Sequence, residues 1–432
     1  MARTAAEQYM IELINRARLD PLAEARRFDL DLNADLDPGT IGPQSLQVLA
    51  PDARLEAAAA GHSDWMLQTD VFSHDGAGGS TAHDRMTEAG YAFEGAWSWR
   101  ENLAWRGTTG PQIDLGAAID VHHEGLYRSA GHRANTFTAQ VREIGVAQSE
   151  GTFTYNGIDY RSSMVTQNFA LSGDRAFVTG VAFEDRDGDR FYDIGEGTGD
   201  VRILGAAGPV LTETAGGYAL GVTGPQTEVE VRVGKTQLAQ LTLDTSRGNV
   251  KLDVVTDADG GTGLALSASA ALSASTLDRV WLLGTDDLRL TGAETRNELI
   301  GNAGDNVLAG RGGADRLSGG AGDDFLKGGA GRDRLSGGAG DDWLEGGTGN
   351  DWLEGGAGAD WFVYSGGVDR IVDFQEADRI QLSHRLHETV HDTIRLGATD
   401  TGDVVLDFGG GDRLVIENPS GLWMLAEDIS FL

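Results

Sequence analysis

The sequence contains no cysteine among its 432 residues. Disulfide bridges, thiolate metal sites and cysteine nucleophiles are therefore excluded, and any metal site has to use histidine, carboxylate or backbone oxygen ligands. No apolar run approaches the length of a transmembrane helix. The N-terminus lacks the basic, apolar and small-residue regions of a secretory signal peptide. Instead, Tyr9, Leu13 and Ala17 fall on one helical face, so a folded domain is expected to begin there.

Basic residues are also scarce. Lys and Arg number 34 against 67 Asp and Glu, which gives a formal net charge of −33. This charge disfavours nucleic acid and anionic membrane surfaces as partners, and it suits divalent cations. Part of it is also consistent with solubility or salt adaptation. The G-x-S-x-G motif of serine hydrolases and the H-E-x-x-H motif of zinc proteases are both missing.

Glycine and aspartate are abundant, and residues 301–363 repeat a nine-residue pattern, G-G-x-G-x-D-x-U-x, seven times. The copies that start at Gly301 and Gly310 are degenerate. Glycine allows turns that direct backbone carbonyls at a cation, and Ca²⁺ prefers carbonyl and carboxylate oxygens. The sixth position supplies the carboxylates and the eighth an apolar side chain for the interior of a parallel β-helix. The sixth-position residues are Asn306, Asp315, Asp324, Asp333, Asp342, Asp351 and Asp360.

This segment resembles the β-roll of RTX proteins, which are secreted bacterial proteins with calcium-binding repeats. In that family two repeats make one turn, so Trp343 and Trp361 are expected to stack on one face and Trp352 to lie on the other. The resemblance implies export by a type I secretion apparatus with an uncleaved C-terminal signal. The apolar and acidic end of the chain, residues 428–432, is similar to that signal.

Calcium sites of extracellular modules typically have dissociation constants of about 10⁻⁴ to 10⁻³ M. Such sites are empty at cytosolic calcium and filled outside the cell, and a ligand that binds only the folded form stabilises it. We therefore expect residues 290–380 to be disordered by charge repulsion inside the cell and to fold after export.

The N-terminal third carries several short motifs that follow a predicted amphipathic helix containing Leu55, His62 and Met66. Together they resemble the CAP family, which includes cysteine-rich secretory proteins, antigen 5 and plant pathogenesis-related proteins. The resemblance covers residues 5–172 and implies an α-β-α sandwich with a cleft. The motifs are F-S-H at 72–74, E-N-L-A at 101–104, S-A-G-H-R-A-N at 129–135 and T-Q-N-F at 166–169.

The CAP resemblance implies that the cleft holds two histidines and two acidic residues. Matched by motif, the histidines are His74 and His132, and one acid is Glu101. Two neutral imidazoles can bind a metal such as Zn²⁺, and a carboxylate that accepts the far ring N–H fixes the tautomer. Coordination positions are then left for water or a ligand.

The second acidic residue is assigned to Asp84, which stands at about the expected distance after His74, with Glu88 and Asp75 as alternatives. A His/Glu cluster can act as general acid and base on a bound water, but it can equally brace a cleft that binds lipid, peptide or glycan. CAP proteins have been assigned peptidase, sterol-binding and signalling roles, so the fold does not decide the activity.

The sequence departs from the CAP pattern at Arg100, where a glycine is usual, and at residues 121–124, where a tryptophan is expected. Arg100 either pairs with a cleft carboxylate or faces solvent. His122 and His123 are assigned mainly to packing or the surface, with a role as extra ligands as the alternative. His62 is expected to be a core histidine.

A second calcium motif begins at Asp185. Its oxygen-bearing side chains have the spacing of an EF-hand loop, in which Glu196 is the bidentate ligand at position twelve. Position six is Arg190 rather than glycine, and glycines around Glu196 argue against a following helix, so the loop is more similar to those of calcium-binding immunoglobulin-like repeats in bacterial adhesins. Its role is expected to be rigidifying the spacer. The ligands are Asp185, Asp187, Asp189, Asp193 and Glu196 by their side chains, and Phe191 by its carbonyl.

The sequence thus predicts a multidomain protein in which an α-β-α sandwich is followed by a small β-sandwich and a parallel β-roll with a β-rich C-terminal cap. The expected function is that of a secreted calcium-binding protein whose CAP-like domain binds a lipid, peptide or surface partner. A metal-assisted hydrolase that uses the His/acid cleft and a calcium-dependent surface adhesin are the alternatives. The segments are 1–172 (CAP-like), 173–255 (β-sandwich), 256–290 (linker and cap), 291–365 (β-roll) and 366–432 (cap and secretion signal).

Overall fold

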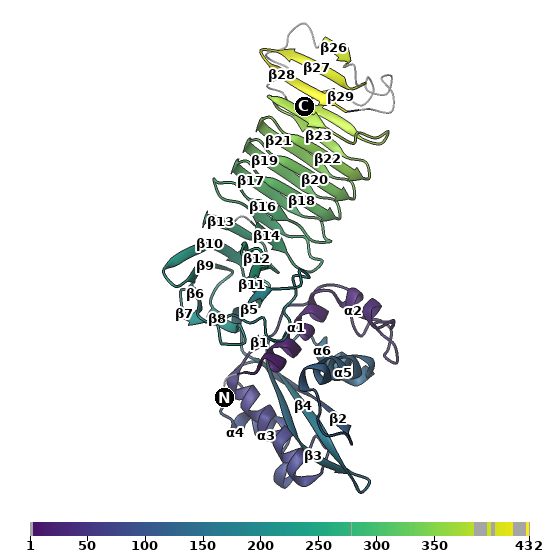
Figure 1. Cartoon of the computed structure of the whole chain (residues 1–432), viewed down its shortest axis with the longest axis vertical. Coiled ribbons are helices and arrows are strands. Elements are labelled where there is room, and N and C mark those ends of the chain that lie inside the picture. The colour runs from purple at the N-terminus through teal and green to yellow at the C-terminus, as the bar shows by residue number, and fades with distance from the viewer. Residues whose placement is uncertain (1–2, 278, 384–394, 399–401, 418–428, 432) are drawn as a thin grey trace. The chain divides into compact units, whose positions relative to one another are not determined.

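The computed structural model describes residues 3–277, 279–383, 395–398, 402–417 and 429–431. The chain divides into two compact units (Figure 1). The first comprises residues 1–227, 231–236 and 245–260, and the second comprises residues 228–230, 237–244 and 261–432. None of the helices in the described part of the chain combines the length and the apolar character needed to cross a bilayer.

The first unit begins with an α-β-α sandwich. Its sheet has the order β1-β3-β4-β2, in which β3 and β4 form a long hairpin and β2 pairs antiparallel with β4. The turn of the hairpin is Asn156-Gly157, and both residues have positive φ, as a two-residue type I′ turn requires. The strands are β1 (Ala50–Pro51), β2 (Trp97–Thr108), β3 (Glu143–Tyr155) and β4 (Ile158–Ser172).

Helices cover both faces of this sheet because alternate residues of a strand point to opposite sides. On β4, Val165 and Phe169 pack in one apolar cluster with α1 and α5, whereas Ala170 packs with α3 and α4. The predicted α-β-α sandwich is confirmed. The helices are α1 (Ala5–Leu19), α2 (Pro21–Arg27), α3 (Ala53–Thr69), α4 (Ala82–Glu88), α5 (Leu115–Arg128) and α6 (Ala130–Thr136), with a 3₁₀ turn at Ala77–Gly79.

A smaller β module follows in the same unit. Its strand β5 pairs parallel with β11 and antiparallel with β8. Lys251 of β11 is buried and bonds the carboxylates of Glu12 in α1 and Asp253, so this module and the sandwich share an interior ion network. The strands of this module are β5 (Ala176–Asp185), β6 (Val201–Gly205), β7 (Gly208–Leu211), β8 (Gly217–Val222) and β11 (Val250–Asp257), whereas β9 (Gln226–Val233) and β10 (Thr236–Asp244) contribute residues to both units.

The second unit contains a parallel β-roll whose coils alternate between two sheets. Each strand pairs with the strand 18 residues away, as in the register Leu308, Leu326, Leu344 and Phe362, all of which are buried. The first sheet contains β13 (Ala270–Ser275), β15 (Arg289–Thr291), β17 (Val307–Gly313), β19 (Phe325–Gly331), β21 (Trp343–Gly349), β23 (Trp361–Tyr364), β25 (Arg379–Leu382) and β29 (Ile429–Phe431).

The second sheet of the roll ends in an antiparallel hairpin, in which β27 pairs with β28. This hairpin is part of the β-rich C-terminal cap that the sequence predicts. The strands of this sheet are β12 (Thr262–Leu266), β14 (Arg279–Leu282), β16 (Glu298–Ile300), β18 (Arg316–Ala321), β20 (Arg334–Ala339), β22 (Trp352–Ala357), β24 (Val368–Ile371), β28 (Asp412–Ile416), β27 (Val404–Gly409) and β26 (Arg395–Ala398).

The tryptophans lie where the two-repeat turn predicts. Trp343 stacks on Trp361 with ring centroids 5.8 Å apart, and Trp352 lies on β22 in the other sheet. Within the segment 256–290 that was expected as linker and cap, residues 262–266 and 270–275 form β12 and β13, which bury Leu264 and Leu272. Of the expected secretion signal, Asp428 and Leu432 lie outside the described residues.

Candidate functional site

The sixth-position aspartates of the β-roll form a ladder. The backbone N–H of each residue at this position donates to Oδ1 of the aspartate 18 residues later, as Asp315 does to Asp333 (2.8 Å). The second oxygen of each carboxylate is buried and has no hydrogen-bond partner, which is costly unless a cation compensates it. These unpaired Oδ2 atoms belong to Asp315, Asp324, Asp333, Asp342, Asp351, Asp360 and Asp369.

Glycines at the first position of each repeat leave room beside these oxygens. A Cβ placed on Gly337 would lie 2.2 Å from Oδ2 of Asp342 and 2.6 Å from the carbonyl oxygen of Gly355. Gly319 has the same relation to Asp324 and Gly337. Carboxylate and carbonyl oxygens therefore converge on a space too narrow for a methyl group. This all-oxygen donor set fits Ca²⁺.

Burial raises the pKa of these carboxyl groups. The pKa of Asp342 rises to about 7 and that of Asp351 to about 6, with desolvation as the largest cause in both. At Asp369 the pKa rises to about 8, and the carboxylate of Asp351 adds to the effect of burial. A cation between the coils would favour the charged forms, because an opposite charge nearby offsets desolvation.

The ladder continues beyond the repeats that the sequence pattern identified. Asp351 donates its N–H to Asp369, and Asp360 donates to Asp378. Ile371 and Ile380 fill the eighth position and are fully buried. Asp369 and Asp378 were missed because the two glycines that open each repeat are replaced there, but Asp and apolar residues keep their nine-residue phase.

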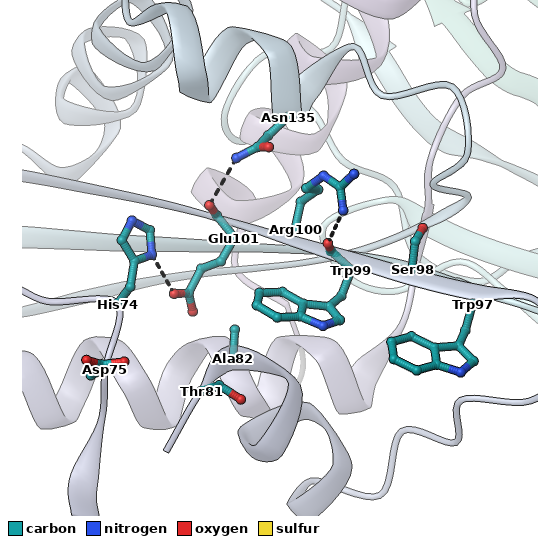
Figure 2. Close-up of a pocket in the computed structure, with 10 residues that line it drawn as sticks. All are labelled: His74, Asp75, Thr81, Ala82, Trp97, Ser98, Trp99, Arg100, Glu101 and Asn135. Carbon is teal, nitrogen blue, oxygen red and sulfur yellow. Dashed lines mark hydrogen bonds and ion pairs between the residues drawn. The ribbon is translucent and has the colours of Figure 1, made fainter. Parts of the chain in front are cut away.

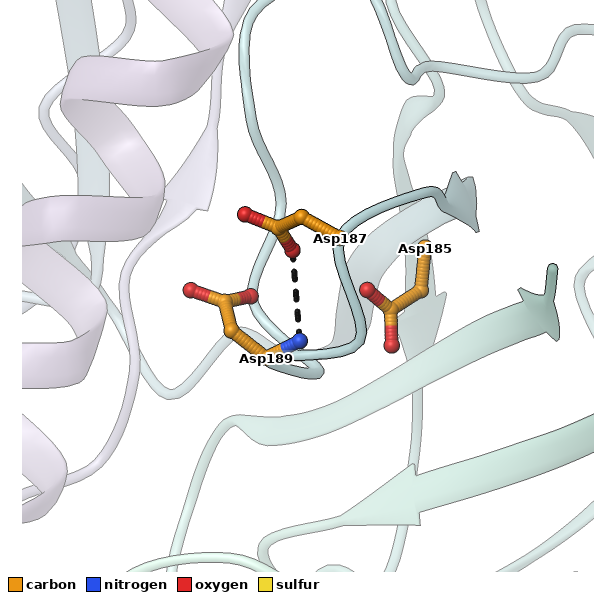
Figure 3. Close-up of side chains that lie close together, drawn as sticks. All are labelled: Asp185, Asp187 and Asp189. Atoms are coloured by element: carbon orange, nitrogen blue, oxygen red, sulfur yellow. Dashed lines mark hydrogen bonds between the residues drawn. The ribbon is translucent and has the colours of Figure 1, made fainter.

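The loop after β5 brings together three of its predicted ligands. Carboxylate oxygens of Asp185, Asp187 and Asp189 lie within 4.8 Å of one another (Figure 3). Glu196 is buried, and its two oxygens accept the backbone N–H groups of Arg186 (2.9 Å) and Asp193 (3.0 Å). The four carboxylates thus belong to one loop. This arrangement supports the proposal that the loop holds calcium.

Arg190 takes the place of the usual glycine in this loop. Its φ of +60° is the left-handed conformation that glycine adopts most easily, so the turn keeps the needed geometry at some cost in strain. Burial and the carboxylates of Asp189, Glu196 and Asp187 raise the pKa of Asp193. No helix follows the loop, since β6 is the next element.

In the sandwich, Glu101 of β2 is the centre of a second polar cluster (Figure 2). Its side chain is buried, and Oε1 lies 2.8 Å from Nδ1 of His74 while Oε2 lies 2.5 Å from Nη2 of Arg85. The hydrogen bond to Glu101 is the main cause of a raised pKa at His74. Both oxygens of the one buried carboxylate are therefore already engaged.

Arg85 was not predicted, and it reaches the cluster from α4. A capping box between Thr81 and Asp84 starts this helix, and Nη1 of Arg85 donates to the carbonyls of Ser80 (2.7 Å) and His74 (3.1 Å). Asp84 is exposed and bonds Thr81, so the structure does not bring it into the cleft as predicted. Asp84 directly precedes Arg85, whose side chain does reach Glu101 in the cleft.

Of the alternatives to Asp84, Asp75 lines the cleft beside His74, whereas Glu88 is exposed at the end of α4. His132 lies on α6, and its pKa is lowered by burial and then by the charge of His74. Within the described residues, the only group of three or more potential ligand side chains whose ligand atoms lie within 4.8 Å of one another is the one at Asp185.

Asparagines fix α6 against β2. Asn102 is fully buried and donates to the carbonyl of His132 (3.2 Å) and to Gln167 (3.1 Å). Asn135 in turn donates to Asn102 (2.9 Å) and to the carbonyl of Glu101 (3.3 Å). The motif asparagines thus have a positioning role.

Three further histidines, His62, His122 and His123, have structural roles. His122 bonds the hydroxyl of Ser163 and His123 bonds Glu24, and both are buried. His62 is also buried and bonds the carbonyl of Ser73. The packing assignments for all three agree with these positions.

Beside Glu101 lies a pocket of about 680 Å³. Arg100 is exposed at its rim and bonds only the carbonyl of Trp99 among the described residues, so it does not pair with a cleft carboxylate. Trp97 is 51% exposed. The pocket is lined by His74, Asp75, Thr81, Ala82, Trp97, Ser98, Trp99, Arg100, Glu101 and Asn135 (Figure 2).

Comparison with family models identifies two parts of the chain. The model of the cysteine-rich secretory protein family (CAP) matches residues 11–169, and that of the RTX calcium-binding nonapeptide repeat matches residues 291–326, 300–335 and 336–371. No curated protein sequence matches the chain.

Two solved structures are similar to part of the chain. One is an extracellular protein containing an SCP domain from Bacillus anthracis str. Ames, with 28% identity and a TM-score of 0.22 over 29% of this chain and 35% of that one. The other is an outer surface protein from Borrelia burgdorferi, with 17% identity and a TM-score of 0.22 over 29% of this chain and 80% of that one. The chain thus spans about a third of the first of these proteins. From the family matches, residues 11–169 form a CAP domain and residues 291–371 carry RTX calcium-binding repeats.

Proposed function

We propose that this calcium-binding protein is exported by type I secretion and works outside the cell as a binding protein, with the cleft beside Glu101 as the ligand site. The RTX repeats support the export route, because proteins with such repeats are typically secreted. Calcium outside the cell then folds the roll, and the CAP domain is delivered with it. Calcium in the loop at Asp185 stiffens the β module that follows the sandwich.

The engagement of Glu101 is the observation that favours binding over hydrolysis. A general base needs a free lone pair directed at the proton that it removes. Here His74 and Arg85 each take one lone pair of the Glu101 carboxylate and hold it in place, and the raised pKa of His74 favours its protonated form. The cluster is thus suited to bracing one wall of the cleft. Trp97 and Trp99 supply apolar surface on the same wall.

Native mass spectrometry of the full-length protein, secreted into calcium-containing medium, tests the binding role. We expect a co-purifying ligand that is reduced in Trp97→Ala and unchanged in Trp352→Ala, which removes an exposed tryptophan from the roll. Turnover of peptide or ester substrates that is lost in His74→Ala would instead establish the hydrolase. Retention on the cell surface that needs calcium but not His74 would establish the adhesin.

Secretion is tested separately. The full chain and a chain that ends at residue 365 are expressed in a bacterial host with and without a type I exporter. We expect only the full chain with the exporter to reach the medium. Export of the shortened chain would contradict the proposed route.

A further inference from the structure

Strand β2 forms one edge of the CAP sheet. In the order β1-β3-β4-β2 its only neighbour is β4, and the contiguous residues Trp97–Glu101 line the cleft. An edge strand has one row of backbone N–H and C=O groups that the sheet does not use, and such a row is a template for another strand. The cleft therefore includes part of an open sheet edge.

The register shows which backbone groups face outward. Trp97 pairs with Ser172, and just before this pair the N–H of Gly173 donates to the carbonyl of Ala96 (2.9 Å). In an antiparallel pair, residues that exchange hydrogen bonds alternate with residues whose N–H and C=O point away. The outward groups are therefore those of Trp97, Trp99 and Glu101.

Two of the outward carbonyls already accept hydrogen bonds from side chains of the protein itself. Nη1 of Arg100 donates to the carbonyl of Trp99 (2.6 Å), and Asn135 donates to the carbonyl of Glu101 (3.3 Å) (Figure 2). Asn135 is held in place by Asn102, whereas Arg100 is exposed. The edge is thus closed at Glu101 by α6 and covered at Trp99 only by a solvent-exposed guanidinium.

We propose that an extended peptide binds as an added strand alongside Trp97–Arg100, an inference that rests on the proposed role of the cleft as a ligand site. The outward N–H and C=O groups of Trp97 and Trp99 alternate at strand spacing, and a polypeptide backbone supplies the matching acceptors and donors. Lipid tails supply neither. The hydrogen-bond pattern of the edge thus selects a peptide among the possible ligands.

The side chains around the edge set the preferred sequence. Trp97 packs in a tilted arrangement against Phe93 and His83, with ring centroids 5.5 and 5.3 Å apart, and offers an apolar face to one side chain of the peptide. When the peptide takes the carbonyl of Trp99, the guanidinium of Arg100 is released and can pair with a carboxylate. The ligand is therefore an extended peptide with an apolar residue and an acidic residue.

A pair of variants at Trp97 isolates the backbone contact. Trp97→Ala removes the indole but keeps the outward N–H, whereas Trp97→Pro removes both. Proline is tolerated on an edge strand where the N–H faces away from the sheet. Because one net hydrogen bond is worth up to about a tenfold change in affinity, Trp97→Pro should bind peptide more weakly than Trp97→Ala by up to about tenfold.

The probe is a decapeptide selected by the full-length protein, in calcium, from a random display library. Two series of that peptide are N-methylated, one at the odd-numbered and one at the even-numbered residues. The series whose methylated N–H groups face β2 should not bind, and the other should bind as the unmodified peptide does. Equal binding by both N-methylated series, or by Trp97→Pro and Trp97→Ala, would overturn the proposal, as would a library without an enriched peptide. If a lipid occupies the cleft in native mass spectra while no peptide is selected, the binding role stands and the peptide is rejected. If no ligand of any class binds, both fail.

Discussion

The backbone N–H of Asp324 donates to Oδ1 of Asp342 at 2.8 Å, and Oδ2 of Asp342 is left buried without a partner. One oxygen of the carboxylate thus locks two successive coils of the same sheet together, while the other is reserved for a cation. Since the relation recurs along the roll, coil docking and calcium binding use the same side chains. The stability of the roll should therefore depend on calcium and on protons together.

The pH dependence of the calcium-free roll follows from the raised pKa values. The folded form binds protons up to about pH 7 at Asp342 and about pH 8 at Asp369, whereas the unfolded chain loses them near the ordinary value of 3.8. The stabilising contribution is full below the unfolded pKa and disappears as the pH rises through the folded pKa. In EGTA we therefore expect a larger folded fraction of the roll at pH 5 than at pH 8.

The strand content of the roll, measured by circular dichroism at the two pH values, gives this difference. Saturating calcium should reverse the order, because deprotonated carboxylates bind the ion better. Calcium-free strand content that is equal at pH 5 and pH 8, or higher at pH 8, would contradict the role assigned to the buried carboxylates.

Replacing one ladder residue should weaken calcium binding without removing the coil contact. In Asp342→Asn an oxygen remains for the N–H of Asp324, but the charged Oδ2 is lost. We expect fewer bound ions by calorimetric titration and a higher calcium midpoint for folding. If one site is lost at a calcium concentration of about 100 times its Kd, folding is weaker by about 2.7 kcal/mol. Asp341→Asn, at the neighbouring exposed position, is the control and should change the ion count little.

The pKa of His74 reports on the CAP cleft. Glu101→Gln removes the negative partner that raises it, so the His74 pKa should fall. Histidine-selective NMR titration of the full-length protein measures the change. Asp84→Asn is the matched control and should leave the pKa of His74 in place, since Asp84 bonds Thr81 instead. A larger effect from Asp84→Asn than from Glu101→Gln would restore the original assignment of the second acid.

Lys251 should be among the most sensitive positions of the first unit. Lys251→Ala leaves the carboxylates of Glu12 and Asp253 buried without their cation. Removing one partner of a buried ion pair typically costs about 3–5 kcal/mol. Chemical denaturation of the full chain, followed by probes of the CAP domain, should show this loss. The exposed Lys235→Ala is the control, and equal stability of the two variants would contradict the proposed network.

The sequence allowed the roll to be predicted in detail because its period fixes the role of each position. A nine-residue phase places Asp342 and Leu344 before any coordinates are known, and the structure finds both buried. Asp369 and Asp378 were missed because the pattern was identified by its glycines, whereas the fold preserves the Asp and apolar positions longer. The strands at 262–275 were mistaken for a linker because Ala, Ser and Gly are typical of both linkers and tightly packed coils.

The CAP cleft was harder to predict, because its members come from segments that meet only in the folded chain. His74 and Glu101 were found through motif resemblance, and their 2.8 Å contact agrees with it. Arg85 has no motif of its own. Its side chain reaches Glu101 because of where α4 begins and because the carbonyls of Ser80 and His74 hold its guanidinium. The spacing of residues along the sequence predicts neither of these features.

The stacked rings of Phe325, Trp343 and Trp361 lie on three successive coils of one sheet, with neighbouring centroids 6.2 and 5.8 Å apart. Indoles held face to face at this separation couple electronically and give a paired circular-dichroism band that isolated indoles lack. The roll thus carries an intrinsic optical reporter, whose signal arises only when neighbouring coils are docked. Calcium titrations can be followed through it without any label, and the order in which coils assemble becomes measurable by moving a single tryptophan.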